Sequence, residues 1–166
     1  MGKNHKEVNY AFIDSQNLNL GIKSRGWVLD WGKFRLLLRN KYKVKKAFLF
    51  IGYIERNTRL YEYLQGVGYI LIFKNVLEIR KGKKVYCKGN VDAELVLHAM
   101  ILLAKFDKAI IVSGDGDFFC LIKYLESKGK LYKILTPNER YSSLIREYSK
   151  YIVDVSKLRN KLEIKK

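Results

Sequence analysis

Short apolar segments of strand length alternate along this chain with longer amphipathic segments, and this alternation restricts the fold more than any other feature. The strand-like runs cover residues 8–13, 45–53, 69–73, 108–113, 131–135 and 152–155. Apolar residues at helical spacing occupy the segments 30–40, 58–66, 92–106, 118–128 and 142–150. Strands that are apolar along most of their length are typical of a sheet buried on both faces. We therefore expect an α/β fold, with three layers (α/β/α) around a mostly parallel central sheet.

One segment departs from this alternation. Residues 77–87 alternate between polar and apolar side chains around Lys81-Gly82, which predicts a β-hairpin. The chain shows neither an internal repeat nor a linker that would divide it, and its 166 residues suit one domain. We expect a single domain that carries a basic β-hairpin.

The charge of the chain predicts the kind of partner. Lys and Arg number 33 against 16 Asp and Glu, a formal net charge of +17. Such a field favours a polyanion, with nucleic acid as the first candidate and an anionic membrane surface as the second. The apolar runs are all shorter than the roughly 18 residues of a membrane span. With only two cysteines and no signal-peptide pattern in residues 1–6, the sequence predicts a cytoplasmic protein.

Part of this charge is concentrated in the predicted hairpin. Its cations and the aromatic residue among them are Arg80, Lys81, Lys83, Lys84, Lys88 and Tyr86. A basic arm of this kind could hold a nucleic-acid backbone while a base stacks on Tyr86. The alternative is a charged sheet edge that discourages aggregation. We favour the first interpretation, because the arm leads directly into a segment of acidic residues.

Four aspartates occupy positions where strands end or helices begin. Asp14 ends the first strand, Asp115 and Asp117 follow the fourth, and Asp92 opens the helical segment 92–106. Ligands of parallel α/β sheets bind at the carboxyl ends of the strands, so the four acids converge there if the first and fourth strands are neighbours. Each acid taken alone could be an ordinary helix cap or turn residue.

Clustered carboxylates repel one another unless a positive charge joins them. Mg²⁺ and Mn²⁺ prefer carboxylate and water oxygens, and either ion can polarise a phosphodiester. Metal-held acids within a basic surface therefore predict a site that cuts nucleic acid.

Three segments carry a resemblance to a known family. They are residues 12–18 (Phe-Ile-Asp-Ser-Gln-Asn-Leu), 88–92 (Lys-Gly-Asn-Val-Asp) and 113–118 (Ser-Gly-Asp-Gly-Asp-Phe). The chain resembles the NYN domains, and in particular the LabA-like group of the PIN-like ribonuclease superfamily. The resemblance covers residues 7–155 and leaves residues 156–166 as a basic tail or helix. It implies a Rossmann-like parallel fold and a metal-dependent endoribonuclease.

The resemblance also implies roles for individual residues. Asp14, Asp92 and Asp115 would bind the metal, with Asp117 as a fourth acid or its partner. Asn17 would orient the substrate or the first loop, and Ser113 would support the metal site through its hydroxyl.

This chain departs from the family pattern at two places. Family members often carry Gly where the first segment has Ser15. They frequently place another acid six residues after Asp92, where this chain has His98. A histidine beside an apolar stripe is more often a core residue than a ligand. The resemblance therefore supports a set of three acids.

Several functions remain open at this point. The leading hypothesis is a Mg²⁺- or Mn²⁺-dependent ribonuclease, and the main alternative is a non-catalytic RNA-binding module with the same fold. A phosphatase of the haloacid-dehalogenase type would need an acid at Gln16, so it fits less well. A homodimer formed through an exposed face is also open.

Overall fold

The computed structural model describes residues 4–88 and 90–166. Its centre is a six-stranded sheet in the order β3-β2-β1-β6-β7-β8, in which all neighbouring pairs are parallel. The strands are β1 (Asn9–Asp14), β2 (Val44–Tyr53), β3 (Tyr69–Asn75), β6 (Lys108–Val112), β7 (Leu131–Thr136) and β8 (Ile152–Asp154). The expected α/β fold is confirmed, and β1 and β6, the first and fourth predicted strands, are neighbours.

Burial on both faces explains why the strands are so apolar. All six residues of β1 are buried. Ala11 and Ile13 belong to one hydrophobic cluster, whereas Tyr10 and Phe12 belong to the other. Successive side chains of a strand point to opposite faces, so each strand contributes to two cores.

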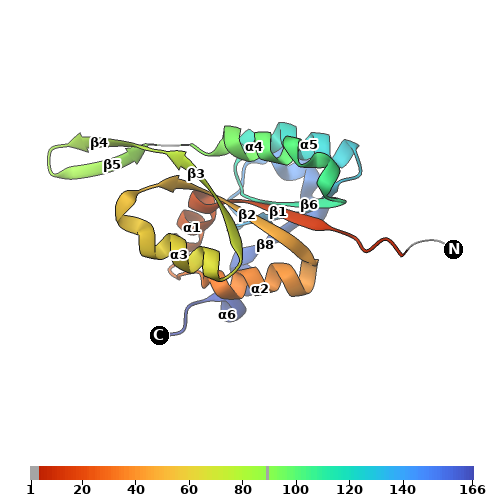
Figure 1. Cartoon of the computed structure of the whole chain (residues 1–166), viewed down its shortest axis with the longest axis horizontal. Helices are drawn as coiled ribbons and strands as arrows, with labels where there is room; N and C mark the ends of the chain where they lie inside the picture. Colours follow the sequence, from red (N-terminus) through yellow and green to blue (C-terminus); the bar gives the residue numbers. More distant parts are fainter. Residues whose placement is uncertain (1–3, 89) are drawn as a thin grey trace.

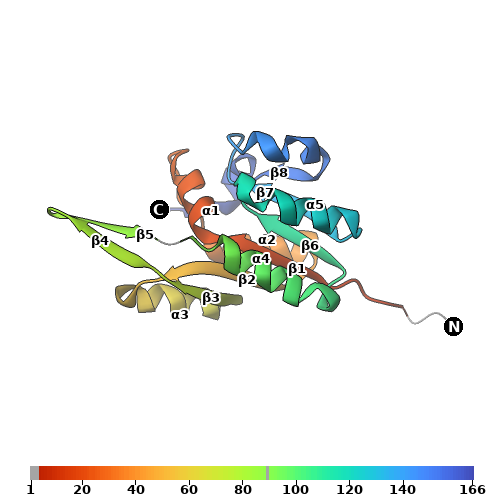
Figure 2. The same ribbon diagram turned by 90° about the horizontal axis from the view of Figure 1, so that it is seen from above.

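Helices cover both faces of the sheet (Figures 1 and 2). One face carries α1 (Ser15–Lys23), α2 (Trp31–Tyr42) and α3 (Thr58–Gly66), and the other carries α4 (Asp92–Ile101) and α5 (Phe119–Ser127). The sequence did not predict α1, whose Asn17, Asn19 and Gly21 are poor helix formers. Burial of Leu18 and Ile22 against the sheet stabilises this helix instead.

Two helical predictions were wrong in part. The helix expected over residues 92–106 ends at Ile101 and is followed by the 3₁₀ turn η2 (Leu103–Lys105). The chain has to turn there, because Phe106 packs against the two sheet residues Tyr10 and Phe12.

The segment expected as an α-helix over 142–150 is the 3₁₀ helix η4 (Ser143–Tyr151). The segment is kinked at Tyr148, whose φ of −95° and ψ of 22° are not helical, and Ile145 and Tyr148 are its buried residues.

The predicted hairpin is confirmed. Its strands β4 (Leu77–Lys81) and β5 (Lys84–Lys88) pair antiparallel, and Gly82 takes a positive φ of 63° in the turn. The hairpin projects from the body of the molecule as an arm (Figures 1 and 2). All the side chains of β4 are exposed, so packing against the body does not hold the arm.

The last elements return to the core. They are η5 (Val155–Leu158) and α6 (Arg159–Leu162), and both Val155 and Leu162 are buried. The amide of Asp30 donates to the carbonyl oxygen of Leu162 at 2.8 Å, which ties α6 to the start of α2. Within the described part of the chain, no helix has the length and apolar character needed to cross a membrane.

Candidate functional site

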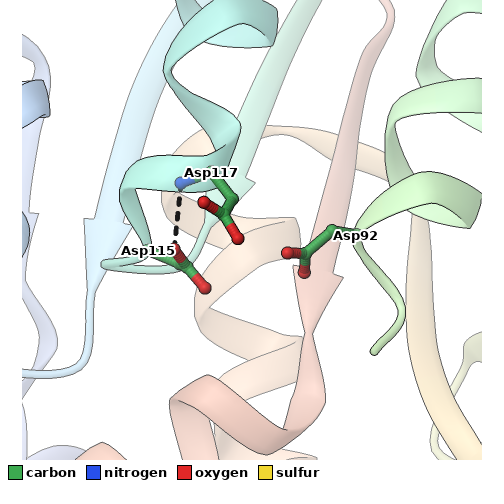
Figure 3. Close-up of side chains that lie close together, drawn as sticks. All are labelled: Asp92, Asp115 and Asp117. Carbon is green, nitrogen blue, oxygen red and sulfur yellow. Dashed lines mark hydrogen bonds between the residues drawn. The ribbon is translucent and has the colours of Figure 1, made fainter. Parts of the chain in front are cut away.

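Three carboxylates meet at the carboxyl edge of the sheet. Asp115 follows β6 and caps η3 (Gly116–Phe118), Asp117 lies within η3, and Asp92 is the first residue of α4. One oxygen from each of these carboxylates lies within 4.8 Å of the others. Figure 3 shows Asp92 facing the other two acids from α4. The amide of Asp117 donates to Asp115 Oδ1 at 2.9 Å, which holds this pair together.

Asp14 lies behind this group, at the end of β1. Asp14 is only 6% exposed, and its carboxylate caps α1 by accepting a hydrogen bond from the amide of Asn17 at 3.2 Å. Burial raises the pKa of Asp14 to about 6, with a smaller rise from the nearby charges of Asp92 and Asp115, while its hydrogen bonds act in the opposite direction. The carboxylate form of Asp14 is therefore costly unless a cation comes close.

Asp92 has a hydrogen-bonding partner that the sequence analysis did not single out. Asn90 donates from Nδ2 to Asp92 Oδ2 at 2.9 Å, and its Oδ1 accepts from the amide of Asp92 at 2.8 Å. Lys74 of β3 donates to the carbonyl of Asn90. Burial raises the pKa of Asp92, and the charges of Asp115 and Asp117 add to this rise.

Asn17 and Ser113 join the ends of β1 and β6. The amide of Gly114 donates to Asn17 Oδ1 at 2.9 Å, and the amide of Asp115 donates to Ser113 Oγ at 3.1 Å. Ser113 Oγ in turn donates to Asp14 Oδ2 at 3.5 Å. The two side chains thus link the loop that carries Asp115 to the residue that precedes α1.

The four acids lack a basic partner among the described residues. The described ranges contain six ion pairs, and none of them includes Asp14, Asp92, Asp115 or Asp117. This is notable in a chain with 33 Lys and Arg residues. An oxygen-rich group of close carboxylates without a basic partner suits a hard divalent cation.

A cavity of about 440 Å³ opens beside the acids, with Asp14, Asp92 and Asp115 in its wall. Arg140, from the loop after β7, also lines it. Sequence reasoning missed Arg140, although its place just beyond the carboxyl end of a parallel strand was the available signal. The wall of the cavity therefore includes both acidic residues and one basic residue.

The remaining candidate residues lie elsewhere. Arg80, Lys81, Lys83 and Lys84 are exposed on the arm and do not line the acid cavity. The side chains of Tyr86 and Lys88, also predicted to bind RNA, lie outside the described part of the structure. His98 forms no hydrogen bond with an acidic side chain in that part; its Nδ1 lies 2.8 Å from the carbonyl of Glu94, and its ring packs against Phe50.

The fold and the acids together define an α/β protein with a group of carboxylates at the carboxyl edge of its parallel sheet, the edge at which ligands of such folds bind. The chain belongs to the NYN domain family, whose sequence model matches residues 10–158. This confirms the resemblance inferred from the three sequence segments.

One relative and one solved structure extend the comparison. The Low amplitude and bright protein LabA of Synechococcus elongatus is 21% identical over 159 residues, which cover 92% of this chain and 86% of that protein. A crystal structure of a protein of unknown function from Vibrio parahaemolyticus matches with a TM-score of 0.75 and 23% identity. That match covers 93% of this chain and 96% of the other, and at this identity it is a likeness of fold.

Proposed function

We propose that this protein is a metal-dependent endoribonuclease that hydrolyses phosphodiester bonds of RNA. The observation that carries the proposal is the group of three carboxylates, with oxygens within 4.8 Å of one another, at the carboxyl edge of the sheet. Membership of the NYN domain family supports a nuclease, and the net charge of +17 supports a polyanionic substrate.

Asp92, Asp115 and Asp117 would hold Mg²⁺ or Mn²⁺, with Asp14 at the inner side of the group. When bound, such an ion supplies a Lewis acid for the phosphodiester. Asn17 and Ser113 would keep the loop of Asp115 in place for the metal through their hydrogen bonds to Gly114 and Asp115.

The basic residues would bind the RNA backbone at two places. Arg140 lines the acid cavity and offers a guanidinium, whose fork of donors matches the oxygens of a phosphate. The exposed cations of the arm, including Lys83 and Lys84, would contact phosphates farther along the strand. Contacts of this kind hold RNA in register without reading its sequence.

The test is cleavage of end-labelled single-stranded RNA in Mg²⁺ or Mn²⁺, with EDTA as the metal-free reference. We expect Asp115→Asn to abolish cleavage and to retain RNA binding, because it removes negative charge beside the substrate phosphate.

Asp154→Asn is the matched control for Asp115→Asn. Asp154 also ends a parallel strand and caps a 3₁₀ helix, by accepting from the amide of Ser156 at 2.9 Å. Equal cleavage by the Asp115 variant and the parent would refute the proposal. Salt-sensitive RNA binding without any metal-dependent cleavage would favour the alternative, a non-catalytic RNA-binding module.

A further inference from the structure

A second cavity, of about 520 Å³, adjoins the acid cavity. It lies over the carboxyl end of β2 between α1 and α3, and Gln16 and Val91 line both cavities. Phe50 in its wall pairs in register with Asp14 of the neighbouring strand. Adjacent strands are about 4.8 Å apart, so the second cavity begins within reach of a ligand held at the acids.

The lining of this cavity differs from that of the acid cavity. Most of its wall is apolar or aromatic, and Trp31, Leu60 and Tyr63 are among its residues. Tyr63 lines this cavity and is 47% exposed, so it is the exposed aromatic residue of the wall that a flat ligand could stack on. No Asp or Glu among the described residues lines it, whereas one cation, Lys23, does. Such a wall suits a flat, partly apolar ligand that carries negative charge at one end.

Three side-chain amides add specific polar groups to this wall. They belong to Gln16, Asn19 and Asn57. Each amide offers both a hydrogen-bond donor and an acceptor, which is what the edge of a nucleobase presents in return. Apolar walls with a few convergent polar groups are the usual composition of a small-ligand site.

We propose that this second cavity is a subsite for an unpaired nucleobase of single-stranded RNA, on a nucleotide next to the phosphate held at the acids. The proposal rests on the proposed function for the position of that phosphate. The base stacks on Tyr63, its edge meets the amides, and Lys23 lies near the backbone. Bases of a duplex are already stacked and paired, so a single strand is the substrate class that can fill this cavity.

Equilibrium binding in EDTA tests the proposal without cleavage. The probes are a fluorescein-labelled single-stranded RNA and an abasic strand of the same length, which keeps the sugar-phosphate backbone and lacks the bases. Stacking of one base on an aromatic ring is worth about 1–3 kcal/mol, so we expect Tyr63→Ala to weaken binding of the normal strand about 5- to 150-fold. Binding of the abasic strand should be unchanged by this substitution.

Two further variants separate stacking from a loss of folding. Tyr63→Phe keeps the ring and should bind like the parent, whereas Val28→Trp should fill the cavity from a wall position that is 47% exposed and weaken binding. Tyr124→Ala is the matched control, because Tyr124 is a similarly exposed tyrosine on α5, across the sheet.

The outcomes distinguish this proposal from the proposed function. If the parent binds normal and abasic strands equally, or if Tyr63→Ala and Val28→Trp both bind like the parent, the nucleobase subsite is refuted even when cleavage occurs. Absence of RNA binding by the parent, both in EDTA and in Mg²⁺, refutes it as well. If Mg²⁺ and Mn²⁺ produce no cleavage but base-dependent binding is lost in Tyr63→Ala, the subsite stands and the nuclease does not.

Discussion

Replacing Asp14 with Asn should change how the stability of the metal-free protein depends on pH. Asp14 is 6% exposed, and its pKa is raised from 3.8 to about 6, chiefly by burial. A carboxyl group with a raised pKa in the folded state stabilises the fold most below its unfolded pKa of 3.8, and this contribution is lost as the pH rises through about 6. The parent in EDTA should therefore carry an uncompensated charge at neutral pH.

The magnitude follows from the two pKa values. The difference between a pKa of about 6 in the folded state and 3.8 in the unfolded state corresponds to about 3 kcal/mol. Protonation of Asp14 favours the folded state over the unfolded state. Between about pH 5 and about pH 8 the factor by which it does so falls about tenfold, which corresponds to about 1.4 kcal/mol. Asn has no charge to desolvate and still caps a helix well. The stability of Asp14→Asn relative to the parent should thus rise by about 1.4 kcal/mol over this range.

Urea unfolding in EDTA at the two pH values measures this difference. Asp30→Asn is the control, because Asp30 caps α2 in the same way, accepting from the amide of Lys33 at 3.0 Å, outside the acid group. The rise for Asp14→Asn should exceed that for Asp30→Asn. A stability difference between Asp14→Asn and the parent that stays constant with pH would refute the reasoning. With excess Mg²⁺ in place of EDTA, the parent should gain more stability than Asp14→Asn.

Three further predictions concern the fold and the arm. Phe118→Ala should lower the free energy of unfolding by about 3–5 kcal/mol in urea titrations, because Phe118 is fully buried; a loss below about 1 kcal/mol would contradict this. Gly21→Ala should lower the thermal midpoint, since its Cβ would lie 2.4 Å from Cβ of Pro137; an unchanged midpoint would show that the two segments separate freely. Replacing Lys83 and Lys84 with Gln should reduce the salt dependence of RNA binding by about 0.7 in slope for each phosphate that the arm no longer neutralises, and an unchanged slope would place the RNA elsewhere.

The inner strands were predictable because strands such as β1 and β6 are buried on both faces, and this leaves a nearly continuous apolar run in the sequence. The helix α1 was not, because Asn17, Asn19 and Gly21 favour other conformations locally. Its formation depends on the local cap that Asp14 provides and on burial of Leu18 and Ile22, and that burial arises only when the sheet is assembled.

The candidate site shows the same division. The positions of Asp14, Asp115 and Asp117 after apolar runs predicted acids at the carboxyl edge of a sheet. The hydrogen bonds from Asn90 to Asp92 and the place of Arg140 in the acid cavity depend on loop conformations that have no periodic pattern. Hence the acids were predicted, together with Asn17 and Ser113, whereas Asn90 and Arg140 were not.

The sequence by itself determined the alternation of strands and helices, the basic character of the chain and the acids that could share one edge. These are local properties, since the periodicity of apolar residues and the charge depend only on which residues follow one another in the sequence. The tertiary structure decided that β1 lies beside β6 and that α1 and α3 enclose a second cavity next to the acids. Strand order and cavity shape depend on contacts between residues as distant as Asn17 and Gly114, which no local pattern encodes.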